Sequence, residues 1–250
     1  MNHMRERILI IDHDPVMARL IGTVIHRYHY RVAGTAENGR EALSQALETE
    51  PDLALVALEM EGTIDGVNTA RYLRTIFDLP VIFYSPATDS ASLSRARLAH
   101  PSGVLPTPFN DRQICTAIDV ALFHHTKQMS TGATFPSREV PSWRGSGAAI
   151  TDPKGKVWFL NRAGKELLGL AQGAVHHRPF DDLATFLDPV RREQIRGVIE
   201  GAMNGGPYPL VKNVCVMRED GGERYLGLIA HPLRSLENQL QGVVSFLHPL

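Results

Sequence analysis

The sequence has few of the features that mark several large classes of protein. Only two of its 250 residues are cysteines, and neither Cys115 nor Cys215 has a His or Cys at metal-ligand spacing around it. We therefore expect both to be small buried side chains of a protein in a reducing compartment. No apolar run is long enough to span a bilayer, and the N-terminus has neither the apolar region nor the cleavage site of a signal peptide. These absences predict a cytoplasmic protein that does not bind membranes.

Neither sign of charge is in excess. Lys and Arg number 26 and Asp and Glu number 27, which gives a net charge of -1. Binding to nucleic acid or to an acidic membrane through charge would need a basic balance, so the composition argues against both. Hydrophobic residues at 43% and charged residues at 21% are typical of globular domains, and the length allows two of them.

Residues 7–124 alternate short apolar runs with amphipathic helical patterns. The runs that predict strands are residues 8–11, 30–34, 53–58, 81–84 and 103–105. Asp14 and Pro15 predict the start of the first helix, as its N-cap and its first helical residue. Five strand–helix units of this length predict an α/β fold, a doubly wound five-stranded parallel sheet whose functional residues lie at the carboxyl ends of the strands.

Four stretches carry a resemblance to a known family: "ILIIDHDP", "PDLALVALEMEGTIDG", "LPVIFYSPATD" and "GVLPTPF". They resemble, in order, the successive signatures of response-regulator receiver domains, and the match covers residues 1–125. The resemblance implies the receiver fold. It also implies an Asp at the end of the third strand that accepts a phosphoryl group, an acidic pair that holds Mg²⁺, and a Lys that neutralises the phosphate.

The sequence departs from this family at the positions that carry its chemistry. The acceptor position is Ala57, and a methyl group cannot form an acyl phosphate. Asp12 matches the first metal ligand, but His13 occupies the second, and imidazole is a poor ligand for Mg²⁺. Thr107 stands in place of the Lys, while Ser85 retains the switch hydroxyl. We therefore expect a degenerate receiver, or pseudo-receiver, that has no catalytic residue.

Other carboxylates leave two alternatives open. A displaced acceptor at Asp52, Glu59 or Asp65 would make the chain a true phosphorelay response regulator. Asp12, His13, Asp14 and Glu59 would also offer ligands to a transition metal, although we expect no metal there because Asp14 caps its helix.

Two further features concern the fifth strand and the loop after it. The resemblance implies an aromatic switch residue on the fifth strand, and this sequence has Val104 at that position. The resemblance also implies a cis peptide bond between Thr107 and Pro108, which a bond before proline can adopt at modest cost.

Residues 126–146 have the composition of a linker, because Gly and Pro recur there and prevent a continuous helix. His124 and His125 precede the linker, and their place at a helix end favours a capping role. Residues 147–250 follow a different order: a hairpin around "DPKG", short helical pieces, a longer helix and three strands. This order predicts an α+β domain with an antiparallel sheet.

Two stretches of this second domain, "ITDPKGKVWFLNRAGKELLG" and "REDGGERYLGLIAHPL", resemble PAS sensor domains. The resemblance implies a pocket that holds haem, flavin, a metabolite or nothing. The middle helices have no Cys for a covalent flavin and the long helix has no His for haem, so we expect neither cofactor. His176 and His177 precede a Pro and are expected to be solvated. The side chains expected in the core are Leu167, Leu168, Phe180, Phe186, Val216 and Leu228.

Together these features predict a non-enzymatic signal-transduction protein of the two-component type, a phosphorylation-independent pseudo-receiver coupled to a PAS domain that binds a ligand or partner. The alternatives are the phosphorelay regulator and the sensory half of a histidine kinase or cyclase. No kinase, cyclase or DNA-binding domain follows in the sequence, so we expect the output to be contact with a signalling protein. We also expect a homodimer in which the outward residues Arg112, Asp119 and Phe123 lie at the interface, with Phe123 buried between subunits. The alternative is that the linker folds back and covers Phe123 within one chain.

Overall fold

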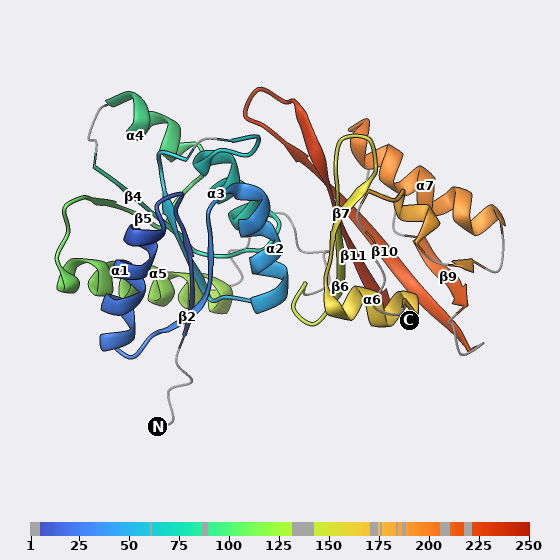
Figure 1. Cartoon of the computed structure of the whole chain (residues 1–250), viewed down its shortest axis with the longest axis horizontal. Coiled ribbons are helices and arrows are strands. Elements are labelled where there is room, and N and C mark those ends of the chain that lie inside the picture. The colour runs from blue at the N-terminus through green and yellow to red at the C-terminus, as the bar shows by residue number, and fades with distance from the viewer. Residues whose placement is uncertain are drawn as a thin grey trace. The chain divides into compact units, whose positions relative to one another are not determined.

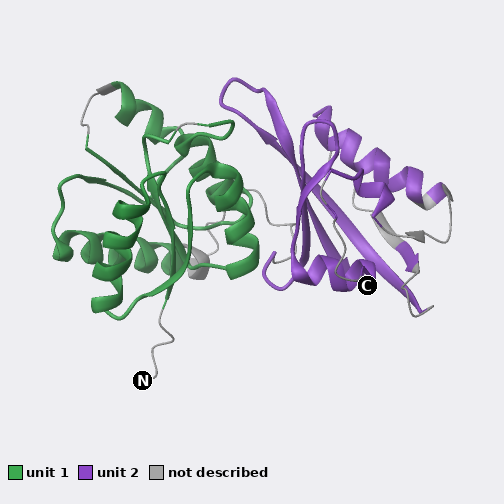
Figure 2. Cartoon of the chain, viewed as in Figure 1, with its two compact units in different colours: residues 1–139 green, residues 140–250 purple. Residues whose placement is uncertain are grey.

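The structure is a computed structural model that describes residues 6–60, 62–86, 90–131, 143–170, 175, 177–183, 185–186, 189–205, 211–217 and 222–250. The chain divides into two compact units, Met1–Glu139 and Val140–Leu250 (Figure 2). The division falls inside the predicted linker. None of the described helices is long and apolar enough to cross a membrane.

The first unit is a parallel sheet with helices on both faces (Figure 1). Its elements are β1 (Arg7–Ile11), α1 (Pro15–Arg27), β2 (Arg31–Ala36), α2 (Gly39–Thr49), β3 (Leu53–Ala57), α3 (Gly66–Thr75), β4 (Val81–Ser85), α4 (Ser90–Arg97), β5 (Gly103–Pro106) and α5 (Asp111–Thr131). The strand order is β2-β1-β3-β4-β5, and every pairing is parallel. Helices α1 and α5 contact each other, as do α2 and α3. The predicted doubly wound fold is confirmed.

Short polar side chains begin the helices of this unit, as the sequence indicates. Oδ1 of Asp14 accepts the amide of Val16 at 2.8 Å, and Pro15 is the first helical residue. Oδ1 of Asp65 accepts the amide of Asn68 at 2.7 Å at the start of α3. Each cap satisfies an amide that has no partner within its own helix, so it fixes where the chain leaves the strand end and begins the helix.

Helix α5 is longer than the sequence pattern suggested. We expected the first domain to end at residue 125, whereas α5 continues to Thr131. No Gly or Pro lies between these two positions, so nothing in the sequence interrupts the helix there. His124 and His125 therefore lie within the helix, and the prediction that they cap its end is wrong. Nε2 of His125 lies 3.5 Å from Oδ1 of Asp78.

The apolar pattern of the first helix predicts that Leu20 is buried with Ile21 and Ile25, and both cysteines are expected to be buried as well. Leu20 is instead 57% exposed, while Ile21 and Ile25 lie on the buried face of α1. Cys115 is buried as expected, and burial raises the pKa of its thiol to about 11. Cys215 is only half-buried, because it lies on β9, one strand from the edge of the second sheet.

The second unit is an antiparallel sheet with helices packed on it (Figure 1). Its elements are β6 (Gly147–Thr151), β7 (Val157–Leu160), α6 (Arg162–Leu168), the 3-10 helix η1 (Phe180–Asp182), β8 (Thr185–Phe186), α7 (Pro189–Met203), β9 (Val211–Met217), β10 (Glu223–Arg234) and β11 (Leu240–Pro249). The strand order is β7-β6-β11-β10-β9-β8, with every pairing antiparallel. Helix α7 contacts β9, β10 and β11. The predicted α+β domain is confirmed.

One hydrophobic core fills the space between this sheet and its helices. The predicted core residues in it are Leu168, Phe180, Val216 and Leu228, with Leu167 packed against them. Phe186 lies in β8, a two-residue strand that the sequence pattern did not predict. His177 is exposed as expected, and His176 lies outside the described residues.

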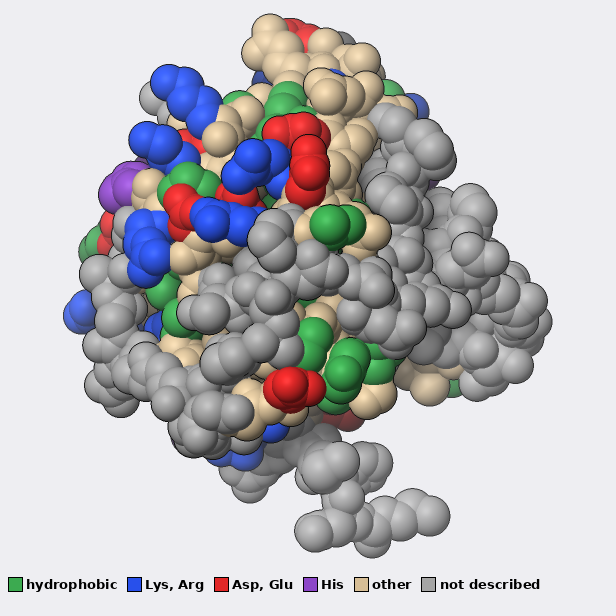
Figure 3. Space-filling view, turned by 90° about the vertical axis from the view of Figure 1, so that its right-hand side faces the viewer, with side chains coloured by type: hydrophobic (Ala, Val, Ile, Leu, Met, Phe, Trp, Pro, Cys, Tyr) green, Lys and Arg blue, Asp and Glu red, His purple; other side chains and the backbone are tan. Residues whose placement is uncertain are grey.

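Ion pairs join α7 to η1. The buried Asp181 accepts a hydrogen bond from Nε of Arg196 at 3.0 Å, and Nε of Arg192 lies 3.5 Å from the same carboxylate oxygen. Figure 3 shows Lys and Arg side chains interspersed with Asp and Glu over the described part of one face. On that part of the surface, therefore, the two signs of charge are mixed.

Candidate functional site at the strand ends

The carboxyl ends of three strands bring together the central residues predicted for the site. Asp12 follows β1, Ala57 ends β3 and Ser85 ends β4, and all three are buried. The register pairs Ala57 with Tyr84, the residue before Ser85. The position that the family resemblance assigns to the phosphoryl acceptor therefore lies directly beside a tyrosine.

Tyr84 reaches across the end of β3 to Asp12. Its hydroxyl donates to Oδ2 of Asp12 at 2.7 Å and lies 3.4 Å from the carbonyl oxygen of Ile11. Strand β3 separates β4, which carries Tyr84, from β1, which precedes Asp12. The phenol must therefore pass over the end of β3, where Ala57 presents only a methyl group.

The rest of the Asp12 carboxylate is also engaged. Oδ1 accepts the amide of Asp14 at 2.9 Å, and Nδ1 of His13 lies 3.4 Å from the same oxygen. The ring of Phe109 meets the Tyr84 ring edge-on, with 6.2 Å between centroids. Burial, and then the hydrogen bond to Asp12, raise the pKa of Tyr84 well above its usual value. The phenol therefore stays protonated and keeps donating to the carboxylate.

These residues do not fit the Mg²⁺ ion that the receiver resemblance implies. Mg²⁺ requires several oxygen ligands in near-octahedral geometry. Among the ligand positions that the resemblance implies, Asp12 supplies the one carboxylate, because Ala57 has no side-chain oxygen and His13 stands at the second acidic position. The oxygens of Asp12 already accept hydrogen bonds from the Asp14 amide and the Tyr84 hydroxyl. Within the part of the chain that the structure describes, no three His, Cys, Asp or Glu side chains are grouped to hold a metal ion. The transition-metal alternative is therefore not formed there.

The three carboxylates that could accept a phosphoryl group in place of Ala57 lie at different distances from the strand-end site. Asp52 precedes β3, at the opposite end of that strand from the site, and its Oδ2 accepts the amide of Arg7 at 2.8 Å. Asp65 caps α3, and its Oδ2 lies 3.0 Å from Nη2 of Arg95. Glu59 is exposed and lies two residues after the end of β3. Glu59 is thus the one carboxylate of the three that is near the site and has no capping role.

The loop after β5 keeps its backbone geometry without the family's cation. The amide of Thr107 donates to the carbonyl oxygen of Ser85 at 2.9 Å. The Thr107–Pro108 bond is cis, as predicted. Val104, at the switch-aromatic position, is exposed. Thr107 supplies a hydroxyl but no positive charge to the strand ends.

The predicted interface residues lie on the exposed side of α5. Arg112, Asp119 and Phe123 are all exposed, and Phe123 is 63% exposed. Asp119 accepts a hydrogen bond from the Tyr30 hydroxyl, which ties α5 to the chain after α1. Nζ of Lys127 lies 6.0 Å from the centre of the Phe123 ring. Phe123 is the large apolar side chain among them that a partner surface would cover.

Sequence reasoning missed Tyr84. Its one sequence signal is a large polar side chain near the end of the otherwise apolar run "VIFYS". A run of that kind shows a buried strand, but it does not show which neighbouring strand a side chain will reach.

The fold and the strand-end site define a receiver-type α/β domain that is followed by an α+β domain with an antiparallel sheet. The family model of the response regulator receiver domain matches residues 8–119, and that of the PAS fold matches residues 145–250. The chain therefore consists of a receiver domain followed by a PAS domain, and it is a signal-transduction protein of the two-component type.

The chain is similar to curated proteins and to a solved structure over different shares of its length. The transcriptional regulatory protein ResD of Bacillus subtilis is 28% identical over 54% of this chain and 55% of its own length, so the chain spans about half the length of that relative. A protein-glutamate methylesterase/protein-glutamine glutaminase of Geobacillus kaustophilus is 25% identical over 86% of this chain and 69% of its own. The solved receiver domain of a modulated diguanylate cyclase from Desulfovibrio desulfuricans is 29% identical, with a TM-score of 0.48 over 50% of this chain and 98% of its own.

Proposed function

We propose that the receiver domain signals without being phosphorylated, as a pseudo-receiver coupled to a PAS domain that binds a ligand or partner. The observation that carries this proposal is the hydrogen bond from Tyr84 to Asp12, which crosses the strand that ends in Ala57. It occupies the place where an acceptor aspartate and a metal ion would have to meet.

Three chemical requirements of phosphoryl transfer are unmet at this site. Ala57 offers no nucleophile, so no acyl phosphate can form at that position. The Asp12 carboxylate already accepts a hydrogen bond on each oxygen, and neither His13 nor Ala57 adds a carboxylate that would complete a metal site beside it. Thr107 offers no charge to the developing phosphate. The loss of all three together supports a role in which the domain acts through binding.

The experiment is incubation of the full chain with Mg²⁺ and acetyl phosphate, followed by intact-mass measurement. We expect no hydroxylamine-labile phosphoryl adduct. Stoichiometric labelling would overturn the proposal, and fragmentation of the labelled protein would identify the acceptor.

Glu59 supports a second candidate function, a phosphorelay regulator with a displaced acceptor. Its exposed carboxylate lines a cavity of about 680 Å³ together with His13 and Arg95. Labelling of the wild type that disappears in Glu59→Gln would establish this candidate in place of the first.

The remaining parts of the proposal concern partners and cofactors. We propose a homodimer that contacts a signalling protein, with no catalytic activity, no nucleic-acid partner, and no haem or flavin in the PAS domain. The net charge of -1 supports the absence of nucleic acid. In the alternative, the chain is the sensory half of a histidine kinase or cyclase. The receiver and PAS domains then have the same roles, and the output is the activity of the kinase or cyclase instead of contact with a signalling protein.

A further inference from the structure

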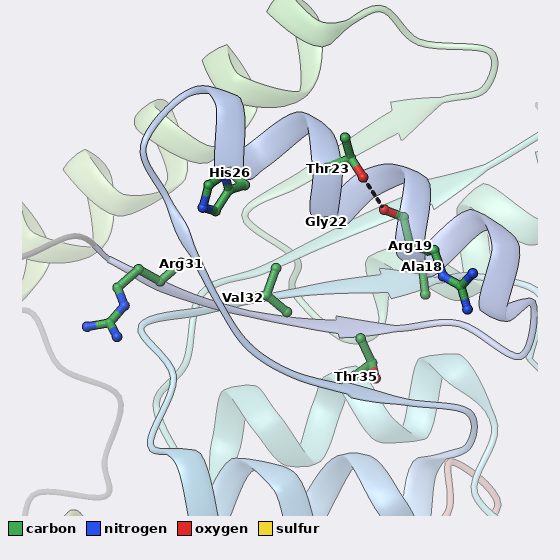
Figure 4. A pocket seen from close by; sticks show the side chains of 8 residues that line it. All are labelled: Ala18, Arg19, Gly22, Thr23, His26, Arg31, Val32 and Thr35. Atoms are coloured by element: carbon green, nitrogen blue, oxygen red, sulfur yellow. Dashed lines mark hydrogen bonds between the residues drawn. The ribbon is translucent and has the colours of Figure 1, made fainter.

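A groove separates helix α1 from the edge strand β2 on the receiver domain (Figure 4). Its volume is about 1040 Å³, and neither Asp12 nor Ala57 is among the residues that line it. The lining residues are Ala18, Arg19, Gly22, Thr23, His26, Arg31, Val32 and Thr35.

Among the described residues that line the groove, every ionisable side chain is basic. Arg19 and His26 come from α1 and Arg31 from β2, and all three are exposed. Among the residues that the structure describes, none of these three side chains has a hydrogen-bond or ion-pair partner. The whole protein carries a net charge of only -1, so this local excess of positive charge is not a consequence of composition.

The floor of the groove is apolar and shallow. Gly22 of α1 has no side chain to fill the groove. A Cβ added at Gly22 would lie 3.4 Å from Cγ2 of Val32. Ala18 is buried beside it, and Val32 is 40% exposed. A ligand in the groove would therefore meet an apolar strip between charged ends.

The spacing of the charges suits a linear ligand. Figure 4 shows Arg19 toward one end of the groove and His26 and Arg31 toward the other. Arg19 and His26 are seven residues apart, about 10.5 Å along a helix axis. An extended chain advances about 3.3 Å per residue, so acidic side chains three residues apart would match this distance. Because most lining residues are exposed, a small molecule would keep much of its surface in water, which is unusual for small-molecule sites.

The edge of β2 is not suited to pairing with another strand. Its register with β1 shifts between Ile8 and Leu9, which leaves an irregularity opposite them in β2. Irregular edges of this kind oppose the addition of a further strand. A partner segment would therefore be held by its side chains in the groove rather than by backbone pairing with β2.

We propose that this groove binds an acidic, extended segment of a partner protein. Complementary charge is what selects such a segment, because carboxylates would pair with Arg19 and Arg31 while apolar atoms cover Val32. The proposal goes beyond phosphorylation-independent signalling, and it holds whether or not the receiver domain is phosphorylated.

The test uses fluorescence anisotropy of a fluorescein-labelled deca-glutamate peptide with the full chain, at low and at physiological salt. We expect saturable binding to the wild type that weakens with salt. The double variant Arg19→Glu/Arg31→Glu should bind about tenfold more weakly or worse. Both side chains are exposed and have no partner in the described part of the chain, so the variant should remain folded by circular dichroism.

The matched control is Arg97→Glu/Lys154→Glu, which changes the net charge equally at exposed sites outside the groove. It should bind the peptide within about twofold of the wild type. Equal weakening in both double variants, or no binding at low salt, would overturn the proposal. Tripolyphosphate that binds as tightly as the peptide, with the same dependence on Arg19 and Arg31, would show a small-anion site instead and would also overturn it.

Discussion

Asp12 is a buried carboxylate that has to be stabilised by its neighbours. Burial of a charge is costly unless hydrogen bonds replace the lost water. Here the Tyr84 hydroxyl and the Asp14 amide supply those bonds, one to each oxygen. The same two bonds that stabilise Asp12 would compete with a metal ion for its oxygens.

Tyr84→Phe should destabilise the protein by about 1–3 kcal/mol, because it leaves one oxygen of the Asp12 carboxylate buried without a donor. Urea unfolding followed by circular dichroism measures this change. Tyr28→Phe is the control, since Tyr28 is 44% exposed, and it should have no measurable effect. Equal stability of Tyr84→Phe and the wild type would mean that the hydrogen bond contributes nothing.

Ala57→Asp should not restore labelling by acetyl phosphate, because the metal ligand and the cation are still missing. It should also lower the free energy of unfolding by about 1–3 kcal/mol, since the new side chain is forced into packed space where Tyr84 crosses β3. The quadruple change His13→Asp/Ala57→Asp/Tyr84→Val/Thr107→Lys restores ligands, cation and space, and it should show Mg²⁺-dependent labelling. Efficient labelling of Ala57→Asp alone would contradict this explanation.

At the scale of single residues, the sequence shows which site residues of the family are missing. It does not show that Tyr84 contacts Asp12 in their place. Ala57, His13 and Thr107 can be recognised because a family pattern assigns a role to each position. The role of Tyr84 could not be predicted, because its contact with Asp12 depends on a side chain of β4 reaching across β3 to the end of β1.

At the scale of elements, alternating apolar runs and helix caps were enough to predict the order of strands and helices. The end of α5 could not be predicted in the same way. Residues 126–131 contain no helix breaker, and the Gly and Pro that suggested a linker begin only at Gly132. The two-residue β8 was missed because so short a strand has no periodicity to detect.

The prediction that the protein forms a homodimer concerns helix α5. Its outer side exposes Phe123, whose apolar surface is best covered by a second subunit. We expect light scattering to show a homodimer that Phe123→Glu converts to a folded monomer. Val16→Glu, at an exposed apolar residue of α1, is the control and should remain a dimer. A wild-type monomer at micromolar concentration would rule out pairing through α5.

At the scale of the whole molecule, the PAS domain should respond to pH separately from the receiver site. Burial lowers the pKa of His231 and of His248. An unfolded histidine has a pKa of about 6.5, so below that pH the unfolded chain binds more protons than the folded one. The stability of the PAS domain should therefore be complete above about pH 6.5 and should fall as the pH is lowered through the folded pKa.

Thermal unfolding between about pH 7.5 and pH 5.5 measures this loss, because most carboxylates do not yet titrate in that range. His231→Gln should reduce the loss, whereas His177→Gln, at an exposed position, should leave it unchanged. A wild type that gains stability as the pH falls would contradict the prediction.

The most direct test of phosphorylation independence is a nuclear magnetic resonance titration of the full chain with Mg²⁺ and beryllofluoride, a mimic of an acyl phosphate. The receiver domain should give no saturable shifts at the amides of Ala57, Ser85 and Leu105, because the acceptor is absent and Tyr84 holds Asp12. Saturable shifts at these amides that disappear in Asp12→Asn would show that the site still binds metal and phosphoryl group, and would contradict the proposed function.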